Sequence, residues 1–281
     1  MKKIFITLFT IAATIPAFAQ SYIVKPQFHV GDSVAYSQNI VTHVFAEDNS
    51  YSMDMNINYK YGMKIREKND SGFVQSFCYK DIKVTNGEGK SDEITSAVEE
   101  SMKQSAHLIL FQLDKNGTPI DVLNYKEILL AYANMADKTF NEKPALQITM
   151  TREQFLKAVV QQYTKEHLLA ILNNSIYGKP IEKGQTIEMS MPKQAGEGII
   201  ESTCTSIILP TKTSGAVINF ASTSNSSNLL NMKLDNTYTF FTNDYQRSVT
   251  THMSAQREVK GKKLNVTMTS QTNCIYSDWK K

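Results

Sequence analysis

The sequence predicts an α+β fold in which curved antiparallel β-sheet, made by two strand-rich blocks, packs against a central helical segment. Three observations predict it. Strand-like alternation fills the first third of the chain, helical spacing fills the middle, and strand-like alternation returns from residue 185 onward. Strands and helices do not alternate along the chain, as they do in parallel α/β proteins. The two blocks could share one large sheet or form two lobes, and the pattern leaves both arrangements open.

Residues 1–19 have the pattern of a secretory signal peptide. Lys2 and Lys3 precede an apolar run over Ile4–Ile15, and Ala17–Ala19 fits a small-residue cleavage site. That run is too short to span a bilayer. We therefore expect an exported product, periplasmic or extracellular, with no transmembrane segment in the mature chain.

Charge and composition exclude one class of partner. The formal net charge is +3, and it falls to about +1 once the two lysines of the signal are removed. Lysines and acids are interspersed without a basic block, so we expect no nucleic acid partner. The apolar share of 41% is sufficient for a proper hydrophobic core.

An antiparallel meander with one helix is expected over residues 20–123. Its strongest pattern runs from Tyr51 to Arg66, where large apolar side chains alternate with polar ones. A strand of this length has to twist and curve. Weaker patterns predict two more strands over residues 33–45 and 73–84, one helix over residues 91–104 and one hairpin over residues 107–123.

Residues 124–180 are predicted to form the helical segment. Tyr125–Asp137 has helical spacing, and Thr151 with Gln154 gives the T-x-x-Q form of a capping box at the start of the next helix. An apolar stripe of helical spacing then continues as far as Asn174.

A second antiparallel meander is expected over residues 181–281. It opens like the first, since Gly184 and Gln185 precede a strand as Gly31 and Asp32 do, and this suggests an ancient duplication. The predicted strands are residues 185–191, 198–209, 215–223, 229–241, 245–259 and 263–276.

Three cysteines occur, Cys78, Cys204 and Cys274. In an oxidising compartment an odd number leaves room for at most one internal disulfide. We expect Cys204 to pair with Cys274, because both lie on strand-like segments of the carboxyl-terminal half. No C-x-x-C spacing occurs, which argues against a thioredoxin-like redox motif and against a zinc knuckle.

The sequence contains no recognisable catalytic or metal-binding motif. The five histidines are scattered without an H-x-H or H-E-x-x-H pair, and neither G-x-S-x-G nor a glycine-rich phosphate loop occurs. We expect a protein that is not an enzyme and that uses no cofactor and no metal. Hydrolysis by acids and histidines that meet only in the fold stays open.

One face of the long strand after residue 50 is the candidate ligand-binding site. Its residues are Tyr51, Met53, Met55, Tyr59 and Tyr61. Thioethers are flexible and polarizable, and tyrosines add a polar tip, so together they suit an adaptable apolar site. Phe73, Phe77 and Tyr79 on the next strand could extend it. An ordinary core beneath the helices would use the same residue types.

Short motifs of the chain resemble those of exported Bacteroidota proteins. They are the Ala19–Gln20 cleavage site, the Val30–Asp32 strand opening, the hairpin turn at Leu113–Gly117 and the second strand opening at Gly184. In element order the chain is also similar to periplasmic lipoprotein carriers of the LolA and LolB type, although it is longer. In those carriers a curved antiparallel sheet wraps around helices and holds acyl chains. This resemblance implies a ligand carrier and assigns no residue.

The leading functional hypothesis is an exported, non-enzymatic protein that holds a lipid or another apolar ligand between sheet and helices. The alternative is a structural or protein-interaction module of the cell envelope. It would bind an envelope protein through its polar surface and the exposed edges of the strands between residues 222 and 273, which are rich in Thr, Ser and Asn.

Overall fold

A computed structural model describes the chain over residues 21–104, 106–142, 151–161, 163–172, 176–190, 199–224, 230–259 and 262–278. The predicted signal peptide, residues 1–19, lies outside the described residues. Antiparallel strands and a smaller number of helices form the α+β fold that the sequence predicts.

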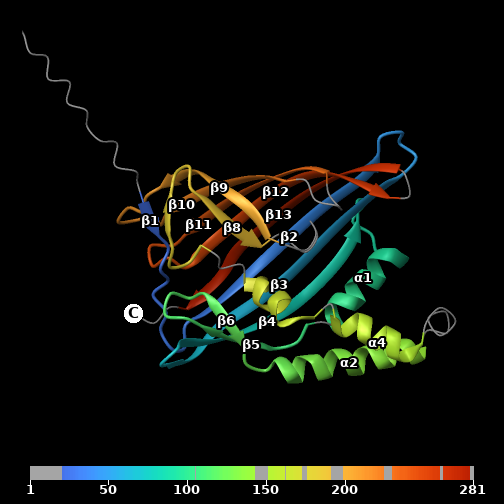
Figure 1. Cartoon of the computed structure of the whole chain (residues 1–281), viewed down its shortest axis with the longest axis horizontal. Coiled ribbons are helices and arrows are strands. Elements are labelled where there is room, and N and C mark those ends of the chain that lie inside the picture. The colour runs from blue at the N-terminus through green and yellow to red at the C-terminus, as the bar shows by residue number, and fades with distance from the viewer. Residues whose placement is uncertain are drawn as a thin grey trace, which may run out of the picture.

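One large curved sheet dominates the molecule (Figure 1). Its strands are β2 (Ser33–Ala46), β3 (Ser52–Asn69), β4 (Gly72–Asn86), β5 (Ile109–Leu113), β6 (Pro119–Val122), β8 (Thr186–Ser190), β9 (Ile199–Ile208), β10 (Val217–Ser224), β11 (Leu230–Phe240), β12 (Gln246–Val259) and β13 (Lys262–Asp278). Among the described residues their order is β6-β5-β4-β3-β2-β13-β12-β11-β10-β9-β8. The two blocks meet where β2 pairs with β13 along both strands, so they share one sheet.

Helices lie beside the strands of the first block (Figure 1). They are α1 (Glu93–Gln104), α2 (Tyr125–Glu142), α4 (Arg152–Gln161), α5 (Lys165–Leu169) and the 3-10 helix η1 (Ala170–Leu172). α1 packs against β4, α2 packs against α4, and α5 packs against β6. None of the helices in the described part of the chain is long and apolar enough to span a membrane.

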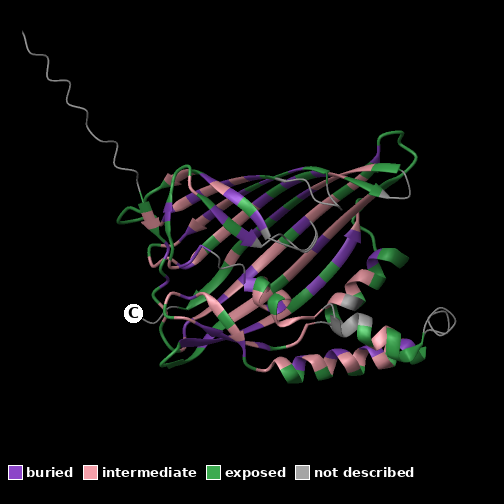
Figure 2. Cartoon of the chain, viewed as in Figure 1, coloured by how far each residue is buried: buried purple, intermediate pink, exposed green. Residues whose placement is uncertain are grey.

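Along much of the sheet one face is packed and the other is more exposed, so that purple residues alternate with pink or green ones (Figure 2). On β11 every second residue is buried: Met232, Leu234, Asn236, Tyr238 and Phe240. The residues between them, such as Lys233 and Asp235, point to the other side and are exposed. We call these sides the inner and the outer face. A single buried face is typical of antiparallel sheets.

The inner face is covered in two different ways. Over β8–β13 it packs against Val24 and the segment Ile176–Ile181. This cover includes a small sheet in which β1 (Ser21–Ile23) pairs with β7 (Pro180–Glu182). Over β3–β5 the inner face packs instead against α2, α5 and η1.

Equivalent turns precede the first long strand of each block. Gly31 and Gly184 have φ angles of 99° and 86°, a left-handed conformation that glycine adopts readily. In the first turn the Asp32 carboxylate accepts a hydrogen bond from the N–H of His29 at 2.8 Å, and in the second the Gln185 side-chain oxygen accepts one from the N–H of Glu182 at 2.9 Å. In both turns the main-chain N–H of Asp32 or Gln185 donates back to the carbonyl of the same partner at 3.0 Å. This shared geometry supports the duplication that the sequence suggests.

Asp32 connects the two blocks. The residue is only 1% exposed, and its carboxylate accepts a hydrogen bond from the hydroxyl of Tyr245 at 2.7 Å. Tyr245 stands in the turn before β12, where Asp244 also accepts from Tyr22 and from the main chain of Lys25. Because a buried carboxylate without partners is costly, these bonds fix the start of β2 against the carboxyl-terminal block.

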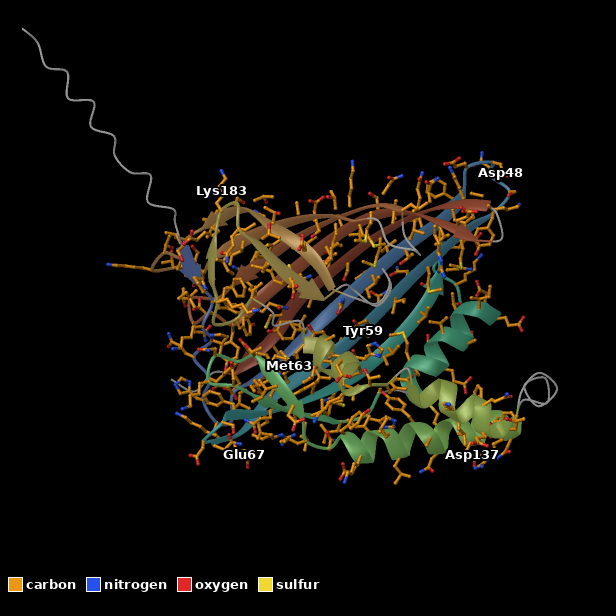
Figure 3. The ribbon with its side chains drawn as sticks, in the orientation of Figure 1. Asp48, Tyr59, Met63, Glu67, Asp137 and Lys183 are labelled. Atoms are coloured by element: carbon orange, nitrogen blue, oxygen red, sulfur yellow. The ribbon has the colours of Figure 1, made fainter. Side chains whose placement is uncertain are left out.

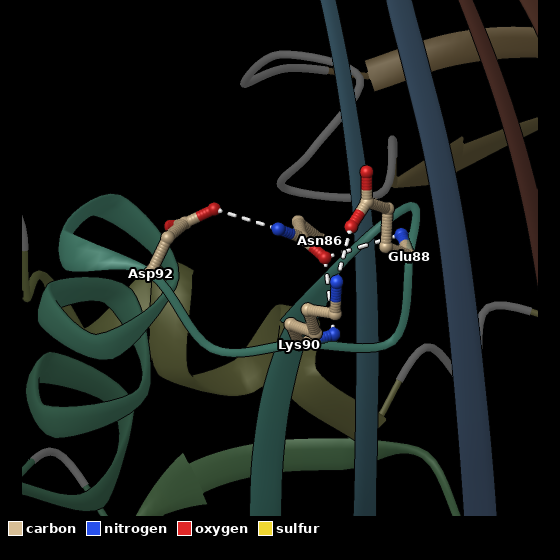
Figure 4. Close-up of polar contacts among 4 residues, drawn as sticks. All are labelled: Asn86, Glu88, Lys90 and Asp92. Carbon is tan, nitrogen blue, oxygen red and sulfur yellow. Dashed lines mark hydrogen bonds and ion pairs between the residues drawn. The ribbon is translucent and has the colours of Figure 1, made fainter.

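The turn between β4 and α1 positions that helix beside the sheet (Figure 4). The Asn86 side-chain oxygen accepts from the N–H groups of Glu88 and Lys90 at 3.1 and 3.0 Å. Its amide nitrogen donates to Asp92 at 3.1 Å, directly before the helix. Asp92 in turn accepts from the N–H of Thr95 at 2.9 Å, as an N-cap does.

The predicted capping box forms at the start of α4. The N–H of Gln154 donates to the Thr151 hydroxyl at 3.2 Å, and the N–H of Thr151 donates to the Gln154 side chain at 2.9 Å. The helical stripe predicted as far as Asn174 is interrupted, however. Thr164 begins a new helix by accepting from the N–H of His167, and Asn174 itself lies outside the described residues.

The predicted Cys204–Cys274 disulfide is not formed, since all three cysteines are free thiols. Cys204 lies on β9 and Cys274 on β13, with three strands between them. Neighbouring strands are about 4.8 Å apart, whereas a disulfide needs Cα atoms within about 7 Å. The strand order therefore keeps the two sulfur atoms apart.

Candidate functional site

The inner face of β3 is only partly covered. Ile57 and Ile65 on this face are 6% and 3% exposed. The other inner residues of the strand, from Met55 to Met63, remain partly exposed. With one residue of β4 they form what we call the Tyr/Met face: Met55, Tyr59, Tyr61, Met63 and Tyr79. A uniformly packed core strand would not alternate between buried and accessible residues on the same side.

The aromatic rings of the Tyr/Met face contact one another across strands. Tyr61 and Tyr79 are direct partners in the β3–β4 register. Tyr61 stacks on Tyr36 of β2 with ring centroids 5.1 Å apart, and Tyr59 meets Tyr79 edge to face at 5.3 Å. Phe77 contacts Tyr79 at 4.8 Å. Such pairs add to the stabilisation that area burial provides, so the rings are held in place.

A chain of hydrogen bonds connects the Tyr/Met face to the carboxyl-terminal block. The hydroxyl of Tyr59 donates to Gln38 Oε1 at 2.6 Å, and Gln38 Nε2 donates to the hydroxyl of Ser270 at 2.9 Å. Gln38 lies opposite Tyr59 on β2 and is partly exposed. It gives the apolar face one uncharged polar group.

Burial raises the pKa of each tyrosine on this face. The pKa of Tyr59 and that of Tyr61 are raised well above the ordinary range, and the pKa of Tyr79 is raised to about 12. The cause is loss of solvent around the phenol, which disfavours the charged form. The phenol groups are thus largely surrounded by protein, although part of each side chain stays accessible. Figure 3 places Tyr59 and Met63 in the middle of the molecule, beside the helical segment.

The structure separates the five predicted site residues. Met55, Tyr59 and Tyr61 lie together on the inner face, and Met53 lies farther along it, opposite Val44. Tyr51 precedes β3 and is 44% exposed, with its hydroxyl 3.5 Å from the sulfur of Met53. Eight residues of strand put Tyr51 roughly 26 Å from Tyr59. Tyr51 therefore does not join the Tyr/Met face.

Sequence reasoning missed two neighbours of this face. Gln38 and Tyr36 belong to the strand predicted over residues 33–45, but only the β2–β3 register shows that they lie opposite Tyr59 and Tyr61. The suggested extension by Phe77 and Tyr79 agrees with the β3–β4 register, which pairs Phe77 with Met63. Phe73 lies farther along β4 and is buried in the core cluster against which Tyr61, Met63 and Tyr79 pack.

Apolar and aromatic residues of the helical side pack near the Tyr/Met face. Val98 and Met102 of α1 contact the core cluster that includes Ile57. Tyr132 of α2 stacks on Tyr163 with ring centroids 3.6 Å apart, and the ring of His107 meets Tyr132 edge to face at 5.1 Å. In the described part of the chain no three His, Cys, Asp or Glu side chains gather to hold a metal ion.

Comparison with known proteins gives a fold and no family. No protein-family model matches the chain, and no curated protein matches it in sequence. Among solved structures it is similar to one described as "Lipid-protein interactions in lipovitellin", with a TM-score of 0.52 and 12% identity. The match covers 90% of this chain and 26% of the lipovitellin chain, so this protein spans about a quarter of that one. At this identity the likeness shows the fold alone.

Two further solved structures match at much lower similarity. One is the YwiB protein from Bacillus subtilis, with a TM-score of 0.15, 8% identity and coverage of 85% of this chain and 92% of that chain. The other is an outer membrane channel from Pseudomonas putida F1, with a TM-score of 0.21, 6% identity and coverage of 89% and 98%. Neither score indicates a shared fold.

In the described part of residues 222–273, the region predicted to supply free strand edges for an interaction module, the strands are paired on both sides. β10, β11, β12 and β13, which span most of residues 222–273, each pair with a neighbour on both sides. Their Thr, Ser and Asn side chains remain, but their main-chain groups are used within the sheet. Among the described residues, the edge strands of the large sheet are β6 and β8.

Proposed function

We propose that this protein binds a lipid or another apolar or amphiphilic ligand at the Tyr/Met face, and that it does so without catalysing a reaction. The observation that carries the proposal is the partial exposure of Met55, Tyr59, Tyr61 and Met63 on the same side of β3 as the buried Ile57 and Ile65. Apolar surface left accessible to water costs about 25 cal/mol per Å², and a ligand of matching chemistry would recover that free energy.

The composition of this face supports a greasy and variable ligand. Two thioethers can adjust their shape to different chains, while three tyrosines in mutual ring contact supply more rigid aromatic surface. The likeness in fold to a lipovitellin structure, which is described by its lipid–protein interactions, supports a lipid as the ligand class. This last support is an analogy of fold, and it assigns no role to any residue of the face.

We further propose that the protein works after export. Residues 1–19 would act as the signal peptide, which places the mature protein in the periplasm or outside the cell. A lipid in such a compartment needs a protein to carry it through water. This is the role that the resemblance to the LolA and LolB carriers implies.

The proposal is tested by expressing the full precursor, purifying the processed protein gently and comparing its native and denaturing mass spectra. We expect the native mass to exceed the chain mass by a lipid or another apolar molecule, which the denaturing spectrum removes. Purified protein stripped of that molecule should also bind 1-dodecanol. A bare chain mass together with no binding of 1-dodecanol would contradict the proposal.

A matched pair of variants locates the site. Met55→Asp places a carboxylate on the Tyr/Met face and should abolish binding of 1-dodecanol, because a charge beside the alkyl chain is not compensated. Asn56→Asp introduces the same charge on the next residue of β3, whose side chain points to the outer face, and should bind as the natural protein does. Circular dichroism shows whether both variants are folded. If folded Met55→Asp still binds 1-dodecanol, the assignment of this face is wrong.

A further inference from the structure

The sheet register shows which side chains share the inner face with the Tyr/Met face. Residues directly opposite each other on antiparallel strands point to the same side. Three rows cross the sheet from β3 through β2, β13 and β12 to β11. They are Met55, Thr42, Met268, Met253 and Leu234; Ile57, Ile40, Ser270, Thr251 and Asn236; and Tyr59, Gln38, Thr272, Val249 and Tyr238.

None of these rows contains a charged residue or a histidine. The outer face of the same strands does carry charged residues and histidine, among them Asp54, Lys60, Lys233, Asp235 and His252. The polar groups of the inner rows are only hydroxyls and amides. Several of them bond to each other, as in the 2.7 Å bond from the Thr251 hydroxyl to Asn236.

The described residues of α1 that pack against this part of the core carry no charge. Val98 and Met102 are the α1 residues that pack against this part of the core. Glu99 of α1 reaches β4, but it forms an ion pair with Lys103 and accepts the N–H of Val84 at 2.8 Å. A ligand at the Tyr/Met face would therefore meet no free countercharge among these residues.

Gln38 is a polar side chain with unused hydrogen-bonding capacity that a ligand at the Tyr/Met face could reach. An amide side chain has two N–H donors and an oxygen with two lone pairs. The bonds to Tyr59 and Ser270 use one lone pair and one N–H. The remaining N–H and lone pair can bind a hydroxyl, an ester or an amide, and Gln38 is partly exposed.

We infer that the ligand is an uncharged amphiphile whose hydroxyl, ester or amide group binds Gln38 while its alkyl chain lies along the Tyr/Met face. This inference rests on the proposed function and narrows it to a chemical class. An ionised carboxylate in the same place would lose its hydration and gain no counterion, so the face selects against fatty-acid anions.

The test compares two probes of equal chain length, 1-dodecanol and dodecanoate, at pH 8, where a carboxylic acid is ionised. Binding to the stripped full-length mature protein is measured by native mass spectrometry and by calorimetry, below the concentration at which either probe aggregates. We expect 1-dodecanol to bind at least about tenfold more tightly than dodecanoate. Equal affinities, or tighter binding of dodecanoate, would overturn the inference and leave the proposed function standing. Binding of neither probe would overturn the proposed function and the inference with it.

A charge placed at Gln38 should reverse this preference. In Gln38→Lys an ammonium group would face the probe, so the affinity for dodecanoate should rise at least about tenfold relative to the affinity for 1-dodecanol. Asn39→Lys is the matched control, because Asn39 is exposed on the outer face of the same strand and should leave the ratio unchanged. An unchanged ratio in folded Gln38→Lys would contradict the role of Gln38. If that variant fails to fold, the comparison of the two probes on the natural protein still decides the inference.

Discussion

β3 and β11 belong to the same sheet but differ in how their inner faces are covered. On β11 all five inner residues from Met232 to Phe240 are buried. On β3 two inner isoleucines are buried, whereas the inner methionines and tyrosines are partly exposed. The cover differs too, since Val24 and the segment Ile176–Ile181 pack in the core that contains β11, whereas helices lie beside β3.

Under the proposed function, this difference separates a structural role from a binding role within one sheet. A fully buried face contributes its area to stability and leaves nothing for a partner. A face that keeps accessible aromatic and thioether surface gains less from folding and can gain from a ligand. The carboxyl-terminal half of the sheet thus acts as the stable frame, and the half near the helices carries the candidate site.

The largest expected effect compares two residues of one row, Leu234 on β11 and Met55 on β3. Leu234→Ala removes a side chain that is 1% exposed and should lower the free energy of unfolding by about 2–5 kcal/mol. Met55→Ala removes a partly exposed side chain and should cost less than half as much. Urea denaturation of both variants measures the difference. If Met55→Ala costs as much as Leu234→Ala, the Tyr/Met face is an ordinary core.

A smaller effect concerns the connection between the two blocks. Tyr245→Phe removes the donor to the buried carboxylate of Asp32 and should lower the free energy of unfolding by about 1–3 kcal/mol. Tyr276→Phe is the control, because Tyr276 is 56% exposed and its loss should change stability by less than about 0.5 kcal/mol. Equal losses in the free energy of unfolding, measured by urea denaturation, would show that the hydrogen bond from Tyr245 does not stabilise the buried carboxylate of Asp32.

A local effect should be confined to the helical cover. Thr151→Ala removes the hydroxyl of the capping box and should destabilise α4 by about 1 kcal/mol. Hydrogen exchange should then quicken at amides of α4 while those of β11 keep their protection. Faster exchange in both elements would mean that the helices and the frame unfold together.

The smallest expected effect is a pH dependence on the helical side. Nε2 of His107 is buried and has no hydrogen-bond partner within the described part of the chain, and burial lowers the pKa of His107 from 6.5. The unfolded state therefore binds the proton more tightly. The stability contributed by the neutral ring is complete above pH 6.5 and is lost as the pH falls from there through the folded-state pKa.

His107→Phe should remove this component. The decrease in Tm between pH 7.5 and pH 5.5 should be smaller in His107→Phe than in the natural protein. His252→Asn, at an exposed position of the outer face, is the control and should keep the natural slope. Identical slopes in all three proteins would contradict the role of His107. On β11 and β12 no such effect is expected from the inner polar residues Asn236 and Thr251, because neither side chain ionises in this pH range.

Much of the fold could be predicted from local patterns. Period-two alternation located the long strands, β3 among them, and T-x-x-Q located the start of α4, because these signals arise from neighbours in sequence. The pairing of β2 with β13 could not be predicted. It brings Asn39 opposite Gln271, and local periodicity carries no information about so distant a partner.

The candidate site was predictable only in part for the same reason. Tyr59 and Tyr61 followed from the alternation, but Tyr51 did not join them, because the strand begins at Ser52 and Tyr51 falls in the turn. Gln38 belongs to the site because the β2–β3 register places it opposite Tyr59. The prediction of a Cys204–Cys274 disulfide was wrong, because two segments that both form strands need not be neighbours in the sheet.

The central claim is that β3 carries a binding face and β11 does not. Photolabelling tests it most directly, with a dodecanol that bears a diazirine on its alkyl chain, followed by peptide mapping of the labelled protein. We predict labels on Met55, Tyr59, Tyr61, Met63 or Tyr79 that excess 1-dodecanol removes. Labels confined to exposed residues such as Tyr51 and Tyr276, or labels that 1-dodecanol does not displace, would contradict the claim.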